Sequence, residues 1–309
     1  FYVDCQAVQD EAAFLEAFRS RWGVDAPASA EDAFEQMLAR LPAKKGDAEA
    51  LRVFLLDEVD ELLAHDVARQ EKLFRAFRAL SQENRCRFVF CGERVLNARL
   101  NDAQSPLFNF CQTLRLTHLL PADAERVILE PMLEMGIQVP DPDALVEAIR
   151  DVSSCHPNVV QYICQQLLLG ISAQEPRQAT VEALEGVIGS RFFAEYYMAV
   201  IWGSASPLER LITLLMIDNP LVTASDLAGL LRDRCALEVQ TAALDEALEH
   251  LVLCSVLDRQ RQYYAFAAQS FPDIVEGTQD VPALIEGLQQ QIAAPHPEGE
   301  ADAGPQVQD

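Results

Sequence analysis

Lysine is scarce in this 309-residue sequence, which has three lysines against 21 arginines and 48 acidic residues, for a formal net charge of −24. Sequence-independent binding to nucleic acid needs basic residues that neutralise phosphates, so this charge argues against such binding. Long hydrophobic runs are also missing. The longest, residues 211–217, is far shorter than the roughly 20 residues that span a bilayer. We therefore expect a soluble chain with no membrane partner.

The eight cysteines lack the C-x2-C spacing that is typical of structural zinc sites and redox dithiols. Most of them have apolar neighbours in the sequence, which favours reduced thiols inside a hydrophobic core. Reduced thiols are typical of cytoplasmic proteins. The sequence therefore predicts a cytoplasmic protein whose cysteines are structural.

Half of the residues are hydrophobic, enough for a globular protein with a sizeable core. In residues 1–120, short apolar runs such as 53–56 and 88–91 alternate with stretches in which apolar residues recur every 3.6 positions, and two of these stretches, 14–22 and 34–41, predict helices after the first strand. This alternation is typical of a parallel α/β layer. Residues 114–116 have the pattern of one more short strand.

Helical patterns dominate from residue 121 onward. Asp123 is placed to cap a first helix, and the pairs Asp141-Pro142 and His156-Pro157 each begin another, because proline suits the first helical position. Residues 121–203 are therefore predicted to form a helical subdomain with a linker helix.

Residues 204–276 begin with a capping box from Ser206 to Glu209, which marks a strong helix start. Two more helical patterns follow, and then a β-hairpin around residues 256–266. Three helices and a hairpin in this order are typical of a winged helix. Residues 277–309 are predicted to form a further helix and a disordered acidic tail rich in proline and glycine.

The clearest candidate site lies where the apolar run 53–56 ends in Asp57 and Glu58. Ligands of open α/β sheets bind at the carboxyl ends of the strands. One carboxylate there can hold the Mg²⁺ of a nucleoside triphosphate, and the next can accept a proton from the attacking water. The alternative is that both only favour the dipole of the following helix. We interpret Asp60 and Glu61 as the solvated start of that helix.

These features resemble the AAA+/STAND branch of the P-loop NTPases, close to the bacterial STAND ATPases and the origin-recognition-like ATPases, over nearly all of residues 1–276. Residues 53–58 are similar to the Walker B strand, and residues 88–94 to the next strand, which ends in a polar sensor. Residues 155–157 are similar to the G-x-P motif of the helical lid. The resemblance implies ATP or ADP bound with Mg²⁺ between core and lid.

By this resemblance, Asp57 holds Mg²⁺ through water and Glu58 orients the hydrolytic water. Arg94, His156 and Pro157 contact the nucleotide. The structural alternatives are a surface ion pair for Arg94, which contributes little stability, and an ordinary helix start for the histidine before proline.

The sequence departs from that family in two places. Cys155 stands where the lid motif has glycine, and no G-x-x-x-x-G-K-[ST] phosphate loop occurs in the 309 residues. In the family, the strand before that loop lies inside the sheet, and its loss would leave backbone groups unpaired. Residues 1–5 resemble the second strand of the core. We therefore expect the loop upstream of Phe1 in a longer protein.

The predicted fold class is α/β plus all-α. It comprises a partial P-loop NTPase core with a parallel sheet over residues 1–120, a helical lid and linker helix over 121–203, a winged helix over 204–276, and a C-terminal helix and tail over 277–309. The resemblance implies a nucleotide-controlled switch in signalling or defence, which is an ATPase if the phosphate loop is present. Its expected partners are effector or sensor domains outside this chain, or further copies in a homo-oligomer.

Two other functions remain open from the sequence. Without a phosphate loop, the chain would be a nucleotide-free interaction scaffold. A winged helix also allows a transcription regulator, but residues 204–276 hold five basic and eleven acidic residues. The expected recognition helix itself carries Asp245, Glu246 and Glu249. Because phosphate neutralisation provides much of the affinity for DNA, we expect this domain to contact protein rather than DNA.

Overall fold

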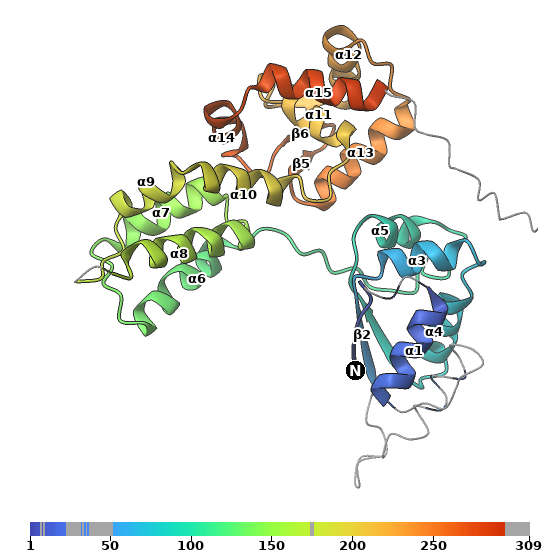
Figure 1. The fold of residues 1–309 in the computed structure, drawn as a ribbon. Helices are drawn as coiled ribbons and strands as arrows, with labels where there is room; N and C mark the ends of the chain where they lie inside the picture. The colour runs from blue at the N-terminus through green and yellow to red at the C-terminus, as the bar shows by residue number, and fades with distance from the viewer. Residues whose placement is uncertain are drawn as a thin grey trace, which may run out of the picture. The chain divides into compact units, whose positions relative to one another are not determined.

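The computed structural model describes residues 1–22 except 7 and 9, residues 32, 34 and 36, and residues 52–173 and 176–293. The chain divides into two compact units, Phe1–Leu114 and Arg115–Asp309 (Figure 1). Each unit has its own hydrophobic core. None of the helices in the described residues combines the length and hydrophobicity needed to cross a bilayer.

The first unit, blue to teal in Figure 1, is an α/β layer. Its elements are β1 (Tyr2–Asp4), α1 (Glu11–Trp22), β2 (Val53–Asp57), α3 (Asp60–Val67), α4 (Lys72–Gln82), β3 (Arg87–Phe90) and α5 (Arg94–Asn101). The three strands lie in the order β1-β2-β3, and both pairs of neighbours are parallel. The parallel α/β layer that the sequence pattern predicts is therefore confirmed for this unit.

Phenylalanine fills one face of this sheet. Phe54 of β2 stacks on Phe88 of β3 with 5.5 Å between ring centroids, and Phe88 stacks on Phe77 of α4 at 4.7 Å. Phe14 of α1 lies 5.8 Å from Phe77. Helices α1 and α4 therefore cover this face, and their buried aromatic rings supply much of its hydrophobic stabilisation.

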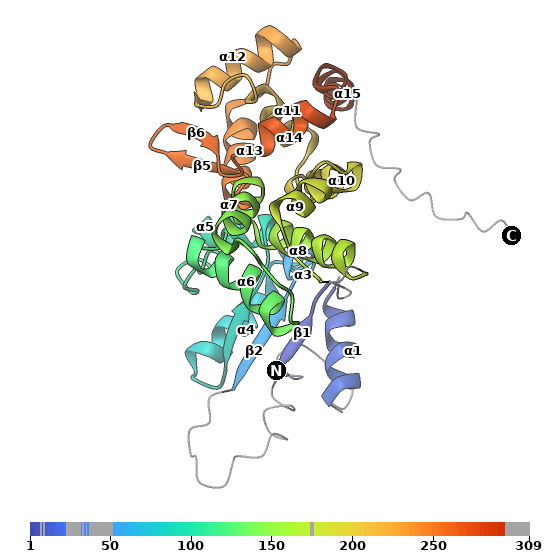
Figure 2. The same cartoon turned by 90° about the vertical axis from the view of Figure 1, so that its left-hand side faces the viewer.

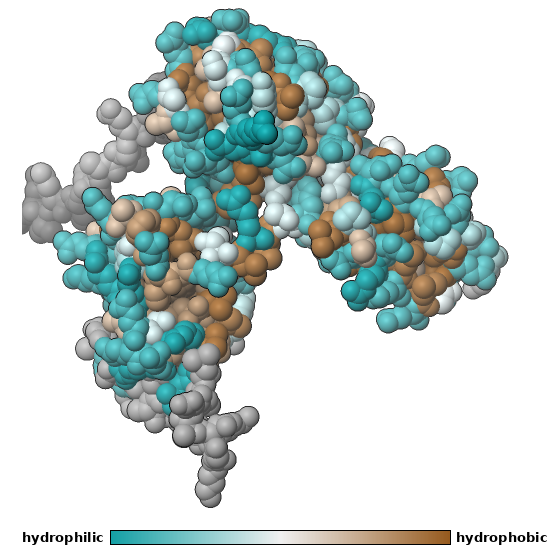
Figure 3. Space-filling model, turned by 180° about the vertical axis from the view of Figure 1, so that it is seen from behind, coloured by the Kyte–Doolittle hydropathy of each residue, from teal (hydrophilic) through white to brown (hydrophobic). Residues whose placement is uncertain are grey.

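The side chains that alternate with these phenylalanines along the strands lie on the opposite face and are exposed. Tyr2, Leu55 and Val89, one from each strand, are 44%, 41% and 51% exposed. Figure 3 shows hydrophobic side chains on the surface of this unit. Because successive side chains of a strand point to opposite faces, the sheet is packed on one face and open at these positions on the other.

Of two further predictions for this part of the chain, one is wrong and the other lies almost wholly outside the described residues. The expected strand at residues 114–116 is wrong, because residues 111–120 contain no strand and Leu114 and Leu116 are 84% and 78% exposed. A short segment without a neighbouring strand has no partner for its backbone groups. The helix predicted after α1, through residues 34–41, lies almost wholly outside the described residues.

The second unit is largely helical. Its elements are α6 (Pro121–Glu134), α7 (Pro142–Ser153), α8 (Pro157–Ile171), α9 (Val181–Ile188), α10 (Arg191–Ile201), α11 (Pro207–Leu215), β4 (Val222–Thr223), α12 (Ala224–Cys235), α13 (Thr241–Leu253), β5 (Leu257–Gln260), β6 (Tyr263–Phe266), α14 (Phe271–Thr278) and α15 (Val281–Ala293). The three strands form an antiparallel sheet in the order β4-β6-β5. Figure 2 shows the β5–β6 hairpin beside α13.

Local sequence signals begin several of these helices. The Asp141 side chain accepts a hydrogen bond from the Ala144 N–H at 3.1 Å at the start of α7. At the start of α11, the Ser206 N–H donates to Glu209 Oε2 at 2.7 Å, and the Glu209 N–H donates to Ser206 Oγ at 3.3 Å. The predicted capping box is therefore confirmed, and it satisfies backbone donors that the helix itself cannot pair.

One helix begins earlier than predicted. Helix α6 starts at Pro121 with Leu120 in the N-cap position, so Asp123 lies in the first turn and does not cap it. The fixed φ of proline suits the first helical position, and this preference sets the start. In the first turn, the Asp123 carboxylate still interacts favourably with the helix dipole.

Candidate functional site

Asp57 is the last residue of β2, the middle strand of the described sheet. Its partner in register on β1 is Asp4. The Tyr2 hydroxyl donates a hydrogen bond to Asp57 Oδ2 at 3.1 Å, and the Glu58 N–H donates to Asp57 Oδ1 at 3.2 Å. The half-buried carboxylate of Asp57 is thus oriented at the carboxyl end of the strand.

Glu58 leaves the strand in a left-handed conformation, with φ at 53°. Such a conformation costs a residue with a side chain about 1–2 kcal/mol, so the surrounding structure must hold it. Most of the Glu58 side chain is exposed. The burial of its remaining part, and after that the nearby carboxylates of Asp57 and Glu93, raise its pKa. A raised pKa makes a carboxylate a better proton acceptor in catalysis.

Asp60 has a structural role that could not be predicted from its position in the sequence. Its carboxylate accepts hydrogen bonds from the N–H groups of Glu93 at 2.6 Å, Val95 at 2.6 Å and Leu96 at 3.2 Å. These groups begin α5 and have no partner within that helix. The interpretation of Asp60 as a solvated helix start is therefore wrong, whereas Glu61 is exposed.

Gly92 makes this cap possible. A Cβ atom at position 92 would collide with Oδ2 of Asp60 and would lie 3.1 Å from Cβ of Leu96. Arg94 follows as the first residue of α5 and is half-buried. The carboxyl ends of the parallel strands β2 and β3 share one edge of the sheet, so the structure brings Asp57, Glu58 and Arg94 to that edge.

The structure adds Cys91 to this edge. Its thiol lies directly after β3, and burial together with the nearby Asp57 carboxylate raises the pKa of Cys91 to about 11. Sequence reasoning passed over this residue because it grouped the cysteines as core thiols. Its place at the end of a strand is the signal that could have identified it.

The other two predicted site residues belong to the second unit. His156 is the N-cap residue of α8, and Pro157 is its first residue. The His156 ring lies edge to face against His118, with 5.2 Å between centroids. Burial and His118 lower the pKa of His156 to about 4, and burial lowers that of His118. His156 is therefore neutral at pH 7.

Several buried polar atoms gather around the turn between α7 and α8. Nε2 of His118, Nε of Arg150, Oγ of Ser154 and Nδ1 of His156 have no hydrogen-bond partner among the described residues. Ser154 and Cys155 are both left-handed, with φ at 49° and 59°. Buried polar atoms are nearly always paired with protein, water or ligand, so this turn offers donors and acceptors to a bound molecule.

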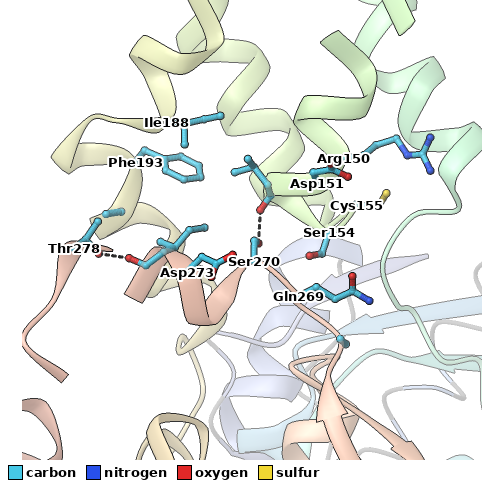
Figure 4. A pocket seen from close by; sticks show the side chains of 14 residues that line it. Arg150, Asp151, Ser154, Cys155, Ile188, Phe193, Gln269, Ser270, Asp273 and Thr278 are labelled. Atoms are coloured by element: carbon cyan, nitrogen blue, oxygen red, sulfur yellow. Dashed lines mark hydrogen bonds between the residues drawn. The ribbon is translucent and has the colours of Figure 1, made fainter. Parts of the chain in front are cut away.

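A cavity of about 800 Å³ opens beside the same turn, a size typical of small-molecule sites. It is lined by the end of α7, by α10 and by residues 267–278. Figure 4 shows Ser154 and Ser270 at this cavity, while the guanidinium of Arg150 points away from it. Ser270 Oγ donates a hydrogen bond to the Val152 carbonyl at 2.5 Å, which ties the α14 end of the unit to α7.

Comparisons with known proteins cover the part of the chain that contains Asp57. Residues 1–100 match an AAA domain. The matched residues contain β1, β2 and β3 with Asp57, Glu58 and Arg94. His156 and Pro157 lie outside them. A comparison of the sequence with curated proteins gives no match.

Two solved structures share the fold. The ORC2 protein of Aeropyrum pernix, solved as ADPNP–ADP complexes, is 14% identical with a TM-score of 0.60, over 95% of this chain and 79% of that chain. A Walker-type ATPase of Pyrococcus abyssi is 14% identical with a TM-score of 0.60, over 89% of this chain and 83% of that chain. The likeness extends beyond the AAA domain to most of the second unit.

Proposed function

We propose that this chain is the nucleotide-controlled switch of a STAND-type ATPase. The observation that carries the proposal is the pair Asp57 and Glu58 at the carboxyl end of β2, within the AAA domain match. Asp57 would hold Mg²⁺ through water, and Glu58 would orient and deprotonate the hydrolytic water. The Aeropyrum pernix ORC2 protein, which shares the fold, was solved with ADPNP and ADP, and this supports nucleotide binding.

The residues at this edge fit a divalent cation. Burial, and after it the carboxylates of Asp57, Glu93, Asp60 and Asp4, raise the pKa of Glu58, so negative charge gathers there. Oxygen ligands of this kind suit Mg²⁺. A bound cation would offset the repulsion between the carboxylates and favour their charged forms.

We infer that Arg94, His156 and Pro157 contact the nucleotide. For His156, support comes from the unpaired Nδ1 atom and the lowered pKa, since a neutral imidazole can donate one hydrogen bond and accept another. For Arg94, support comes from its place at the start of α5, beyond the end of β3.

The proposed domain organisation follows the order of elements. Helices α6 to α10 would form the lid and linker, and α11 to α13 with β4, β5 and β6 would form a winged helix. Support for the winged helix comes from three helices followed by a hairpin whose inner strand β6 pairs with both β4 and β5. Nucleotide exchange or hydrolysis would shift the population between two arrangements of these domains, through a difference in affinity for them.

The output of such a switch would be made by an effector or sensor domain outside this chain, or by homo-oligomerisation, in cytoplasmic signalling or defence. An acidic winged helix fits a protein partner better than DNA, because Asp245, Glu246 and Glu249 are all exposed on α13.

The test measures bound nucleotide and ATP turnover in the longest native form of the protein that contains this chain, since the 309 residues hold no phosphate loop. The Glu58→Gln variant should keep nucleotide and lose turnover by about a hundredfold or more, because it removes the proton acceptor. The control is Glu61→Gln, an exposed glutamate three residues further on, which should turn over ATP like the wild type.

The competing function is a nucleotide-free interaction scaffold, and the observation that favours it is the missing phosphate-loop motif. A scaffold would contain no bound nucleotide and would show no turnover in any form. If nucleotide binds but Glu58→Gln turns over normally, the role given to Glu58 is wrong.

A further inference from the structure

Helices α11 and α13 bring a carboxylate, an imidazole and a thiol into one hydrogen-bonded series. Nδ1 of His250 lies 3.1 Å from Oε2 of Glu209, and Nε2 of His250 lies 3.4 Å from Sγ of Cys254. Sγ of Cys254 also lies 3.6 Å from Oγ of Ser204. This order of groups is the one in which an imidazole activates a nucleophile and a carboxylate orients the imidazole.

The fold fixes the geometry of the series. His250 and Cys254 are one helical turn apart, with Cys254 as the C-cap of α13, so they lie on the same side of the helix. Glu209 belongs to the capping box of α11, where the Ser206 N–H holds the same Oε2 atom at 2.7 Å. Glu209 is 0% exposed and His250 4% exposed, whereas Cys254 is only half-buried.

The charges around His250 favour its protonated form. Burial alone would lower the pKa of His250, but hydrogen bonds with Cys254 on α13 and Glu209 on α11 raise it to about 9. The last turn of a helix also stabilises a cation. A protonated imidazole next to a thiol favours the thiolate, which is the reactive form of cysteine.

Three cysteines elsewhere in the chain lie in environments that disfavour the thiolate. Burial raises the pKa of Cys164 to about 12 and that of Cys111 to about 11, and Cys91 faces Asp57. Within the described part of the chain, no other cysteine has a hydrogen bond to an imidazole. Cys254 is therefore distinguished by its surroundings.

We propose that Cys254 is a site of reversible oxidation by hydroperoxides, activated by His250 and positioned by Glu209. The thiolate sulfur attacks the terminal oxygen of the hydroperoxide, so that an S–O bond forms and the O–O bond breaks. The electron pair leaves on the second oxygen, which takes the proton of the His250 imidazolium and departs as water or an alcohol. Sulfur is oxidised to a sulfenic acid by two electrons, and the peroxide is reduced.

The first test uses the reduced wild-type full chain. Limiting iodoacetamide is added between pH 5.5 and 9, and the alkylation rate of each cysteine is read from its peptide by mass spectrometry. At pH 7, Cys254 should react at least about tenfold faster than Cys164 and Cys91, and its rate should change little down to pH 6. A Cys254 rate that falls about tenfold per pH unit below pH 8, like an ordinary thiol, would overturn the proposal.

Variants separate activation from simple exposure. His250→Gln should slow the alkylation of Cys254 at pH 7 by about tenfold or more, and Glu209→Gln by a smaller factor. Glu249→Gln, an exposed neighbour on α13, is the matched control and should leave the rate unchanged. Circular dichroism checks that each variant folds. If the first two do not fold, the wild-type pH profile alone decides.

The second test adds hydrogen peroxide in the presence of dimedone, which traps sulfenic acids. Dimedone should label Cys254 before any other cysteine, and without dimedone a thiol reductant should remove the added oxygen. Labelling of Cys91 or Cys111 ahead of Cys254 would contradict the proposal. Because the series lies wholly within the second unit, neither test depends on nucleotide binding, and the two proposals can fail separately.

Discussion

At the scale of single residues, the candidate nucleotide edge depends on a close contact between Gly92 and Asp60. The Asp60 carboxylate holds the first N–H groups of α5, and with them the start of the helix that carries Arg94. Only a residue without a Cβ atom leaves room for that carboxylate. A glycine after a strand is thus required here by packing and not by its backbone conformation.

Replacement of Gly92 by alanine should therefore weaken the first unit. The new methyl group collides with Oδ2 of Asp60 and displaces the cap of α5, and the loss of a cap costs about 1–2 kcal/mol. Urea unfolding, followed by circular dichroism, measures the decrease in the free energy of unfolding.

The matched control is Gly229→Ala, within α12, where a Cβ atom meets nothing within 4 Å. Alanine is the better helix former by up to about 1 kcal/mol, so this variant should be slightly more stable than the wild type. Equal stability of Gly92→Ala and the wild type would show that Asp60 does not act as the cap.

At the scale of elements, the buried pair Glu209 and His250 joins α11 to α13, and its strength depends on pH. The pKa of His250 is raised to about 9 in the folded chain, against about 6.5 for an unperturbed histidine. A raised pKa means that the folded state binds the proton more tightly. The resulting stabilisation is complete below about pH 6.5 and is lost as the pH rises to about 9.

The free energy of unfolding of the second unit should therefore fall by roughly 2–3 kcal/mol between pH 6 and pH 9.5 through this histidine. Urea titrations at several pH values measure it, with His250→Gln as the reference, since that variant lacks the titrating group and should depend less on pH. Parallel pH curves for the two proteins would show that the pair does not control stability.

Elements set by local signals were predictable from the sequence. The end of β2 at Asp57, the strand at β3 and the capping box from Ser206 to Glu209 all follow from neighbouring residues, and the structure confirms them. The roles proposed for Asp57 and Glu58 stay predictions, because their chemistry depends on a ligand.

Contacts between residues distant in the sequence were not predictable. Asp60 reaches the start of α5 from 33 residues away, and Glu209 meets His250 across 41 residues. Neither pairing leaves a periodic trace in the sequence. The strand predicted at residues 114–116 was wrong for a related reason. This short segment has the local pattern of a strand, but the structure gives it no neighbouring strand to pair with.

At the scale of the whole molecule, the chain is two units with separate hydrophobic cores. Residues 112–117, where one unit passes into the other, have no regular secondary structure, and Leu114 and Leu116 are 84% and 78% exposed. The sheet of the first unit is packed on one face and exposes Tyr2, Leu55 and Val89 on the other. The two units are therefore stabilised by separate cores, and they can unfold separately.

Calorimetry of the full chain should resolve two unfolding transitions, the first from the unit whose sheet exposes Tyr2, Leu55 and Val89, because exposed apolar side chains add no burial to its stability. Brief proteolysis should cut near Arg115, since an exposed irregular segment is the preferred site of cleavage. A single transition whose calorimetric and van't Hoff enthalpies agree would show that the units unfold together.

The left-handed backbone of Glu58 has a consequence for how this sequence can change over generations. Glycine or asparagine would occupy φ near 53° at little cost, so folding alone favours the replacement of the glutamate by one of these residues. Nothing in the packing of an exposed side chain opposes that replacement. The proposed role of its carboxylate is what would favour glutamate over these residues at position 58.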